Sequence, residues 1–479
     1  MHIGDPATFK IVRDALQRAN YTEQAVCERL AIASIGSARS LARQVSEWKL
    51  NDALDVCIRL FLDGAFVPAV QIVSLLTEPA LQGMQELGLL RCREDDASQL
   101  AATVQLGPTQ GIYVASDRES NPDLTPFALP PDTVYPAIGK NTQRFLSLLP
   151  DVQPEAFLEL CGGAGAAALI AAARGARQAF TFDITPRSTD FAEFNRLLNG
   201  LENVTAACGD LYEPAGGRTF DFIAAHPPYV PATGDGLIYK EGGEDGESII
   251  RRIIEGLPVY LRPGGQFHCL CAGSDRSQGA FEDRIRTWLG SAAGEFDIVL
   301  ASEGVVTPHT LKRWEILTAR FKITGMFYGS VIIRRHATAR PCFTLRRMRE
   351  EGASFAGTEW LFQAAAQLHS MSALEVMNLY PRIADEVELQ VQHKWSKGEF
   401  HVRSLELRIR NPFPRQVQAE VWVVKFLEAS DGSRTGSQIA KSLLDAGVIN
   451  EAPAQVIAGM MCTMILEGFL TVTTLPEAG

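Results

Sequence analysis

Apolar positions between about residues 137 and 345 alternate between strand-like runs and helix-like spacing. Short apolar runs bounded by turn residues predict buried strands. The expected strands are "AFLELC", "AFTFD", "VTAAC", "FDFIAA", "GQFHCLC", "FDIVLA" and "GSVIIRR". Helices are expected at residues 165–175, 188–199, 246–256 and 279–289. This order predicts an α/β fold with a seven-stranded, parallel, doubly wound sheet that has helices on both faces and a ligand site at the carboxyl ends of the strands.

The segments on either side of this core follow other patterns. Residues 1–118 show helical spacing in "ALDVCIRLFLDGAFVPAVQIVSLL", and the strand-like runs "LAATVQL" and "GIYVASD" follow. Helices that end in a two-stranded wing favour a winged-helix domain. Residues 119–136 are rich in Pro, Asp and Ser, which is typical of a linker.

The last segment, residues 346–479, combines helices with an alternating strand, "LELRIR". A second winged-helix-like run is expected from about 415 to 475. It contains the long apolar helix "VIAGMMCTMIL", which is too apolar to remain in water and must be buried. The predicted organisation is therefore an N-terminal helical domain (1–118), a linker (119–136), an α/β core (137–345) and a C-terminal α+β domain (346–479).

Composition narrows the class of protein. Of 479 residues, 46% are hydrophobic and 21% are charged, as is usual for globular proteins, and the formal net charge of −11 opposes binding of nucleic acid through the overall field. The N-terminus "MHIGDPATFK" has no secretory signal pattern, and no run approaches the ~18 apolar residues of a membrane span. A cytoplasmic protein without membrane attachment is expected. The nine cysteines are scattered and predict no metal site.

A glycine-rich loop carries the first chemical signal. "FLELCGGAG" ends a strand at Glu159 and opens a helix through Gly163 and Gly165, where glycine lets the backbone approach a ligand. Asp183 ends the next strand about 20 residues later, where a carboxylate can bind a ribose diol. Asp210 follows the third strand and can hold an adenine amino group. The acidic residue before the glycines would repel a pyrophosphate and suits a cationic ligand.

The fourth strand ends in "HPPY", which is the second chemical signal. With the glycine loop and the acidic strand ends, this motif resembles the class I S-adenosylmethionine-dependent methyltransferases, which have a Rossmann-like core. The resemblance implies S-adenosyl-L-methionine as cofactor. The cofactor-binding residues that it implies are Glu159, Cys161, Gly163, Gly165, Asp183, Ile184, Asp210, Leu211 and His226.

"HPPY" is similar to the N-P-P-Y motif of methyltransferases that act on planar amino nitrogens. In that family the first side chain and the first proline carbonyl accept hydrogen bonds from the substrate NH₂, and the tyrosine stacks on the planar group. The implied catalytic residues are therefore His226, Pro227 and Tyr229. Histidine replaces the family's asparagine: a neutral imidazole still accepts a hydrogen bond, and it can also act as a general base.

Two further segments extend the resemblance. Gly242, Gly243, Asp245 and Gly246 fit a G-G-x-D-G segment of the protein-glutamine-N5 and ribosomal-RNA guanine-N2 methyltransferases. Residues 1–118 resemble the winged-helix extension of a bacterial group with this core, so that the resemblance covers roughly the first 340 residues.

Several functions remain open from the sequence. The leading hypothesis is methylation of a nitrogen on a protein or peptide side chain or on an RNA base. The alternatives are a small-molecule N- or O-methyltransferase with His226 as general base, and a non-catalytic winged-helix regulator. The candidate recognition helices "TEPALQGMQELG" and "PAQVIAGMMCTMILEG" contain no Lys or Arg, which argues against DNA binding. Packing, substrate gating or a homodimer through these domains is expected instead.

Overall fold

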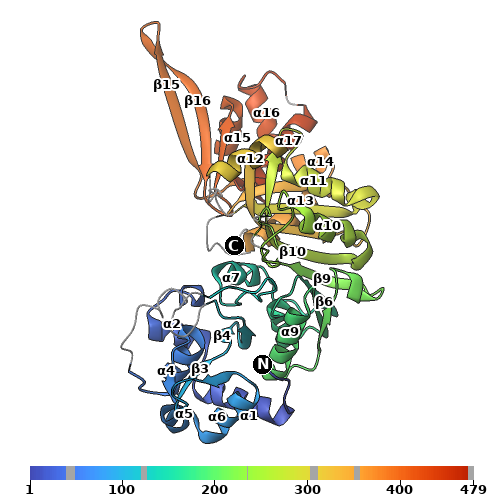
Figure 1. Cartoon of the computed structure of the whole chain (residues 1–479). Coiled ribbons are helices and arrows are strands. Elements are labelled where there is room, and N and C mark those ends of the chain that lie inside the picture. Colours follow the sequence, from blue (N-terminus) through green and yellow to red (C-terminus); the bar gives the residue numbers. More distant parts are fainter. Residues whose placement is uncertain are drawn as a thin grey trace. The chain divides into compact units, whose positions relative to one another are not determined.

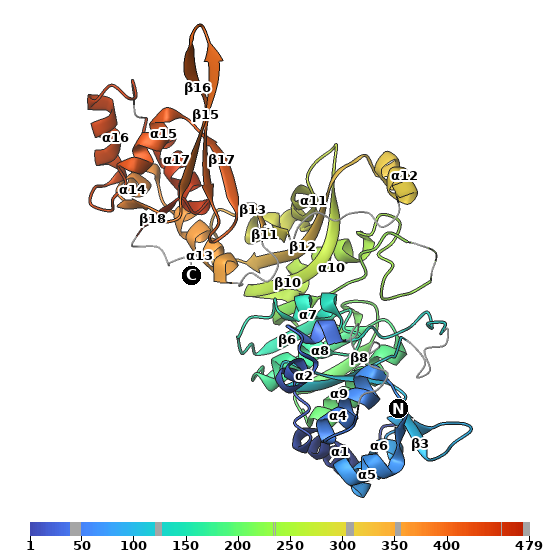
Figure 2. The same cartoon turned by 90° about the vertical axis from the view of Figure 1, so that its left-hand side faces the viewer.

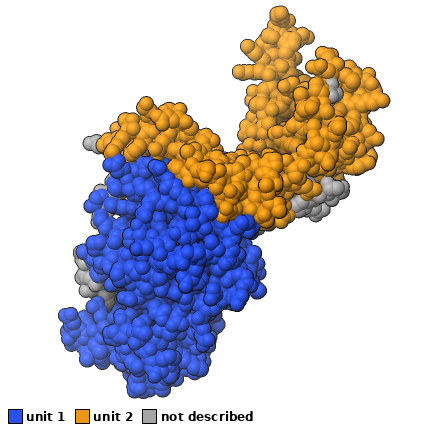
Figure 3. All heavy atoms as spheres, turned by 90° about the vertical axis from the view of Figure 1, so that its right-hand side faces the viewer, with its two compact units in different colours: residues 1–273 blue, residues 274–479 orange. Residues whose placement is uncertain are grey.

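The computed structural model describes residues 1–38, 49–119, 127–232, 234, 236–302, 311–349, 356–451 and 453–472. The chain divides into two compact units, residues 1–273 and 274–479 (Figure 3). This division does not test the domain boundaries expected after residues 118, 136 and 345, which stay a prediction.

A parallel sheet forms the centre of the first unit (Figure 1). Its strands are β6 (Ala156–Leu160), β7 (Gln178–Asp183), β8 (Val204–Cys208), β9 (Phe220–Ala225) and β10 (Leu261–Arg276). The spatial order is β10-β9-β6-β7-β8, and all neighbouring pairs in this set are parallel. The chain moves outward from β6 to β8 and then returns to β9 on the other side of β6. The boundary between β6 and β9 is therefore the topological switch point, where open α/β sheets bind their ligands.

Three helices of the first unit connect these strands close to the expected ranges: α8 (Ala166–Ala173), α9 (Pro186–Asn199) and α10 (Ser248–Tyr260). The sequence did not predict α7 (Lys140–Leu146), which precedes β6, or the short η4 (Glu213–Ala215). Helix α8 is apolar on all sides and is buried along most of its length, as expected for a helix enclosed by a core. Helix α9 begins at a Thr185 cap and ends at Gly200 in the left-handed conformation.

The N-terminal part of the first unit contributes helices and two small sheets. The helical elements are α1 (Pro6–Arg18), α2 (Glu23–Leu30), η1 (Ile35–Ser37), α4 (Ala53–Cys57), η3 (Ile58–Asp63), α5 (Ala69–Leu76) and α6 (Glu78–Glu86). The strands are β1 (Val67–Pro68), β2 (Leu90–Cys92), β3 (Gln99–Ala102), β4 (Gln105–Thr109) and β5 (Ile112–Ser116). They form one sheet in the order β1-β3-β2 and a separate β4-β5 hairpin.

The strand pairing differs from the wing expected from "LAATVQL" and "GIYVASD". The first run splits into β3 and β4, which belong to different sheets, and β3 pairs with β2. Contacts with α9 explain the separate pairing of β4 with β5. The buried side chain of Asn195 in α9 donates a hydrogen bond to the carbonyl of Ala115 and accepts one from the N–H of Ala115. Asn199, one turn later, bonds the backbone of Tyr113 in the same way. These two side chains satisfy the backbone of β5 and hold the β4-β5 hairpin against the core.

The second unit contains the rest of the chain. Its helical elements are α11 (Phe281–Trp288), η5 (Gly290–Glu295), α12 (Leu311–Phe321), α13 (Ala356–Ser370), α14 (Ala373–Met377), α15 (Val421–Glu428), α16 (Gly436–Asp445) and α17 (Ala454–Leu466). Its strands are β11 (Phe296–Ser302), β12 (Ile323–Arg335), β13 (Thr344–Met348), β14 (Pro381–Ile383), β15 (Glu388–Ser396), β16 (Glu399–Ile409), β17 (Arg415–Ala419) and β18 (Leu470–Val472).

All seven strands predicted for the core are present, but the expectation of a wholly parallel sheet is wrong, because β11 pairs with β12 antiparallel. Strand β11 also pairs with β13, which the sequence did not predict, in parallel. The sequence also did not predict β15 and β17, which flank the expected "LELRIR" strand in a β15-β16-β17 sheet. Helix α17 is buried in the core of the second unit through Ile457, Met461 and Ile465, as its apolar sequence required. Among the described helices, none has the length and apolar character needed to cross a bilayer.

Candidate functional site

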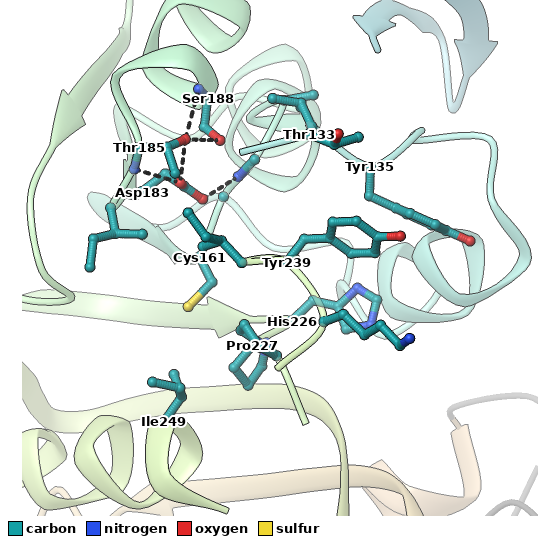
Figure 4. Close-up of a pocket in the computed structure, with 18 of the residues that line it drawn as sticks. Thr133, Tyr135, Cys161, Asp183, Thr185, Ser188, His226, Pro227, Tyr239 and Ile249 are labelled. Atoms are coloured by element: carbon teal, nitrogen blue, oxygen red, sulfur yellow. Dashed lines mark hydrogen bonds between the residues drawn. The ribbon is translucent and has the colours of Figure 1, made fainter. Parts of the chain in front are cut away.

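A cavity of about 490 Å³ opens at the carboxyl ends of the parallel strands in the first unit (Figure 4). Its wall is made by the ends of β6, β7 and β9, the loop after β8, residues 132–145 and residues 236–241. The volume lies within the range of about 300–1,000 Å³ that is usual for small-molecule and cofactor sites. The cavity therefore lies at the switch point that the topology predicts.

Glu159 occupies the buried end of β6 and faces the first turn of α8. Its carboxylate accepts the backbone N–H groups of Ala167 at 3.1 Å and Ala168 at 3.0 Å. Burial raises the pKa of Glu159 to about 7, and these hydrogen bonds act in the opposite direction. Both carboxylate oxygens thus stabilise the N-terminus of α8, a structural contact that the sequence did not predict for this residue.

Asp183 organises the glycine loop from the end of β7. Its carboxylate accepts the N–H of Gly163 at 2.9 Å, and the N–H and hydroxyl of Thr185 at 3.0 and 3.2 Å (Figure 4). Gly163 has φ of 52°, and a Cβ there would meet only Val134, at 3.9 Å, so the backbone faces open space in the cavity. Gly165 also has positive φ, but it caps α8 and does not line the cavity.

Asp210 and Leu211 follow β8 and also line the cavity. Asp210 forms an ion pair with Arg252 of α10 at 2.8 Å. Both side chains are well exposed, so this contact contributes little to stability. Cys161 and Ile184 line the same wall, and burial raises the pKa of the Cys161 thiol.

His226 follows β9 directly and contacts two aromatic rings. Its ring centroid lies 5.3 Å from that of Phe145 and 6.0 Å from that of Tyr229. Burial among these groups lowers the pKa of His226 to about 4. The imidazole is consequently neutral at neutral pH, with one ring nitrogen able to accept a hydrogen bond.

The loop from Pro227 to Tyr229 is held by the glycine segment that follows it. Val230 exchanges backbone hydrogen bonds with this segment, donating to Lys240 at 3.0 Å and accepting from Gly242 at 2.8 Å. A Cβ at Gly242 would lie 2.7 Å from the Pro228 carbonyl oxygen and 2.9 Å from the Tyr229 Cα, so only glycine permits this approach. The G-G-x-D-G segment thus supports the "HPPY" loop.

The sequence did not predict the aromatic and polar residues that residues 132–145 and 236–241 bring to the cavity. Tyr135 and Tyr239 lie 5.3 Å apart between ring centroids, and both line the wall (Figure 4). Asn141 donates to the Tyr229 hydroxyl at 3.2 Å. Residues 132–135, at the end of the expected linker, thus line the cavity. Their one sequence signal was an aromatic residue among prolines, in "PPDTVYP".

The residues that line the cavity fit an adenosyl cofactor that carries a cationic sulfonium. Asp183 and Asp210 face the cavity from adjacent strand ends and suit a ribose diol and an adenine amino group. Gly163 provides a bare backbone surface. Five acidic residues line the cavity (Asp132, Glu159, Asp183, Asp210 and Glu241), whereas Lys240 is the one Lys or Arg among the described lining residues, which favours a cationic ligand over a phosphate. The fold and this site define a class I S-adenosylmethionine-dependent methyltransferase.

Comparison with known proteins gives the family. Residues 135–289 match the family model of the methyltransferase small domain. A protein of Methanocaldococcus jannaschii, provisionally named a protein N5-glutamine methyltransferase, is 34% identical over 143 residues, which are 29% of this chain and 71% of that protein. The chain belongs to the same family of S-adenosylmethionine-dependent methyltransferases.

Other relatives match over smaller shares of their length. The ribosomal protein uL3 glutamine methyltransferase of Bradyrhizobium diazoefficiens is 32% identical over 30% of this chain and 49% of its own. The release factor glutamine methyltransferase of Xylella fastidiosa is 36% identical over 22% of this chain and 43% of its own. This chain therefore spans about half the length, or less, of these bacterial relatives.

Proposed function

We propose that this methyltransferase transfers a methyl group to the side-chain amide nitrogen of a glutamine in a protein. The relatives named above carry protein glutamine in their names, and the "HPPY" loop keeps the parts that a planar amide needs. S-adenosylmethionine, when bound, supplies the electrophilic methyl group. The protein's own residues then have to position the amide and exclude water.

The observation that carries the proposal is the environment of His226. Its pKa of about 4 makes it a neutral acceptor for an amide N–H, the role that asparagine has in the family motif. Tyr229, held at its hydroxyl by Asn141, offers a ring for a flat substrate group to stack on. The Pro227 carbonyl is a second acceptor, because the two prolines restrict its direction.

The same observation weakens the alternative of a hydroxyl-methylating enzyme with His226 as general base. A base with a pKa near 4 takes a proton poorly from a hydroxyl group, since efficient general bases have pKa values near the working pH. Amide methylation depends less on a general base, because a nitrogen that has gained a methyl group readily loses its proton to water.

The test is a transfer assay with radiolabelled S-adenosylmethionine on protein, RNA and small-molecule fractions of a cell lysate that lacks the enzyme. We expect label in the protein fraction, recovered as N5-methylglutamine after enzymatic digestion. Label confined to the RNA or small-molecule fraction would contradict the proposal. A chain with Asp183→Ala serves as the control for cofactor-dependent labelling.

We also propose that α5, α6 and the β1-β3-β2 sheet form a winged-helix domain with a packing role. Gly83 of α6 would bring a Cβ within 3.1 Å of Val12 in α1, so that α1 covers one face of the helix that would otherwise read DNA. The exposed residues of α6 include Glu78 and Glu86 and no Lys or Arg, which supports the expectation of no DNA binding. A homodimer through these elements stays a prediction.

We also propose a cytoplasmic location for this protein. The relatives' names give a ribosomal protein and a release factor as their substrates, and both belong to translation.

A further inference from the structure

The hairpin β15-β16 extends beyond the rest of the second unit (Figure 2) and has two unlike faces. Residues opposite each other in an antiparallel pair point to the same face. One face is apolar apart from a histidine, and its cross-strand pairs are Leu389–Leu407, Val391–Leu405, His393–Val402 and Trp395–Phe400. The opposite face is polar, with the pairs Glu388–Arg408, Gln390–Glu406, Gln392–Ser404, Lys394–His401 and Ser396–Glu399.

Much of the apolar face is exposed to water. The exposed fractions are 42% for Leu389, 42% for Val391, 60% for Trp395, 67% for Phe400 and 54% for Val402. Isolated apolar residues are common on protein surfaces, but a continuous row along one hairpin marks a contact surface.

The outer strand of this hairpin also has an open edge. Among the described strands, β15 has a partner on one side only, in the sheet order β15-β16-β17. It is nine residues long and contains no proline. Its pairing with β16 shifts after Gln392, which leaves Arg403 of β16 as the extra residue and β15 itself regular. A long, regular and partly apolar edge is suited to pair with another strand.

We propose that this edge pairs with β15 of a second copy of the chain, antiparallel and centred on Val391. An isologous contact of this kind closes a two-fold dimer. With Val391 opposite its own copy, Leu389 lies opposite His393, and Val387 lies opposite Trp395. The apolar residues of the two strands then form one continuous face, because odd-numbered residues oppose odd-numbered residues.

Charged side chains on the polar face favour the register centred on Val391 over the registers centred on Gln390 and Gln392. Centred on Val391, the pairing sets Glu388 opposite Lys394 twice by symmetry and Gln390 opposite Gln392. A centre at Gln392 places Glu388 opposite Ser396 and removes the ion pair. A centre at Gln390 places Glu388 opposite Gln392 and moves Lys394 opposite Glu386, which lies outside β15 and already accepts a hydrogen bond from Asn411. A lysine on an edge strand ordinarily hinders pairing, but here it meets a carboxylate of the partner copy.

The test is sedimentation velocity of the full chain from about 1 to 100 μM, because a contact limited to one strand is expected to be weak. The unmodified chain should dimerise within this range. Glu388→Lys should weaken self-association roughly tenfold or more, since two like-charged pairs replace two ion pairs. Adding Lys394→Glu to Glu388→Lys should restore the affinity to within about threefold of the unmodified chain.

Lys397→Glu is the matched control, because it changes the charge in the turn of the hairpin, outside β15, and should leave dimerisation unchanged. Circular dichroism and cofactor binding verify that each variant is folded. A chain that stays monomeric at the highest concentration, or a double variant that does not regain affinity, overturns the proposal. A monomer that instead pellets with phosphatidylserine vesicles through Trp395 would overturn it in favour of a membrane. The inference does not depend on the proposed function.

Discussion

At the scale of single residues, the Asp183 carboxylate holds the glycine loop and is expected to bind the cofactor as well. It accepts hydrogen bonds from Gly163 and Thr185, and each carboxylate oxygen can accept more than one. The same residue lines the cavity, where we expect its carboxylate to bind a ribose diol. A change at this position should therefore affect cofactor binding more than overall folding.

We expect Asp183→Ala to weaken binding of S-adenosylmethionine roughly tenfold to a hundredfold, because charge-assisted hydrogen bonds contribute about 1.5–3 kcal/mol. Isothermal titration calorimetry measures this loss. Asp190→Ala, an exposed position on α9 that does not line the cavity, is the control and should bind normally. Unchanged affinity in the Asp183 variant would remove Asp183 from the cofactor site.

His226 supports a second prediction at this scale. Its pKa falls from 6.5 to about 4, so the ring is neutral above the lower value, and kcat/KM should show no step from this residue between about pH 6 and 8. His226→Asn should keep much of the activity, because asparagine also offers an acceptor. A general base would instead lose on the order of 10²–10⁴ in rate on this change.

The same shift has a consequence for stability. A depressed histidine pKa means that the unfolded chain binds more protons, so this contribution is present above pH 6.5 and is lost as the pH falls through about 4. Thermal melts of the wild type and of His226→Asn should therefore diverge in this interval, with the wild type losing more stability. Parallel melting curves would show that the ring is not shielded from water.

At the scale of elements, the glycine segment 242–246 determines the shape of the "HPPY" loop. We expect Gly242→Ala to lower kcat by on the order of 10²-fold while cofactor binding remains, because its Cβ would displace the loop at Pro228 and Tyr229. Steady-state kinetics and calorimetry together separate the two effects. Gly294→Ala, where a Cβ meets nothing within 4 Å, is the control. Normal activity in the Gly242 variant would show that the loop tolerates the shift.

The sequence predicted strands best where a short apolar run is bounded by turn residues. The parallel strands are short apolar runs, and burial on both faces makes such runs easy to identify. Strand β13 was not predicted because "TLRRM" carries two arginines, and its place beside β11 depends on pairing rather than on its own pattern. Strand β15 was not predicted although "LQVQHKW" alternates and Gly398 follows it in a tight turn, because nearly all of its residues are exposed and no apolar run marks it as a buried strand.

At the scale of the whole molecule, the C-terminal segment is part of the core of the second unit. Val299 of β11 and Ile332 of β12 belong to the same buried cluster as Leu361 of α13 and Met461 of α17. A chain that ends near residue 350 would expose this surface to water. We expect it to aggregate or to change its oligomeric state in size-exclusion chromatography.

A chain that ends at residue 472 keeps α17 and β18 and serves as the control for this truncation. It should behave as the full chain does. If the shorter chain were a well-behaved monomer of full activity, the C-terminal segment would be an independent addition and not a part of this core.

The sequence by itself determined the seven strands, the glycine loop, the acidic strand ends and the "HPPY" motif, because each of these depends on residues that lie close together along the chain. Carboxyl ends of parallel strands meet at one edge of a sheet, so the order of these local signals predicted the edge at which the cavity opens.

Only the tertiary structure decided which residues from distant segments complete that site. Tyr135, Asn141 and Phe145 reach it through long-range contacts that no local pattern records. The neutral state of His226 and the bonding of Glu159 to α8 likewise depend on burial and on neighbours far away in sequence. Local patterns specify which element a residue belongs to, whereas electrostatics and packing depend on what the fold places around it.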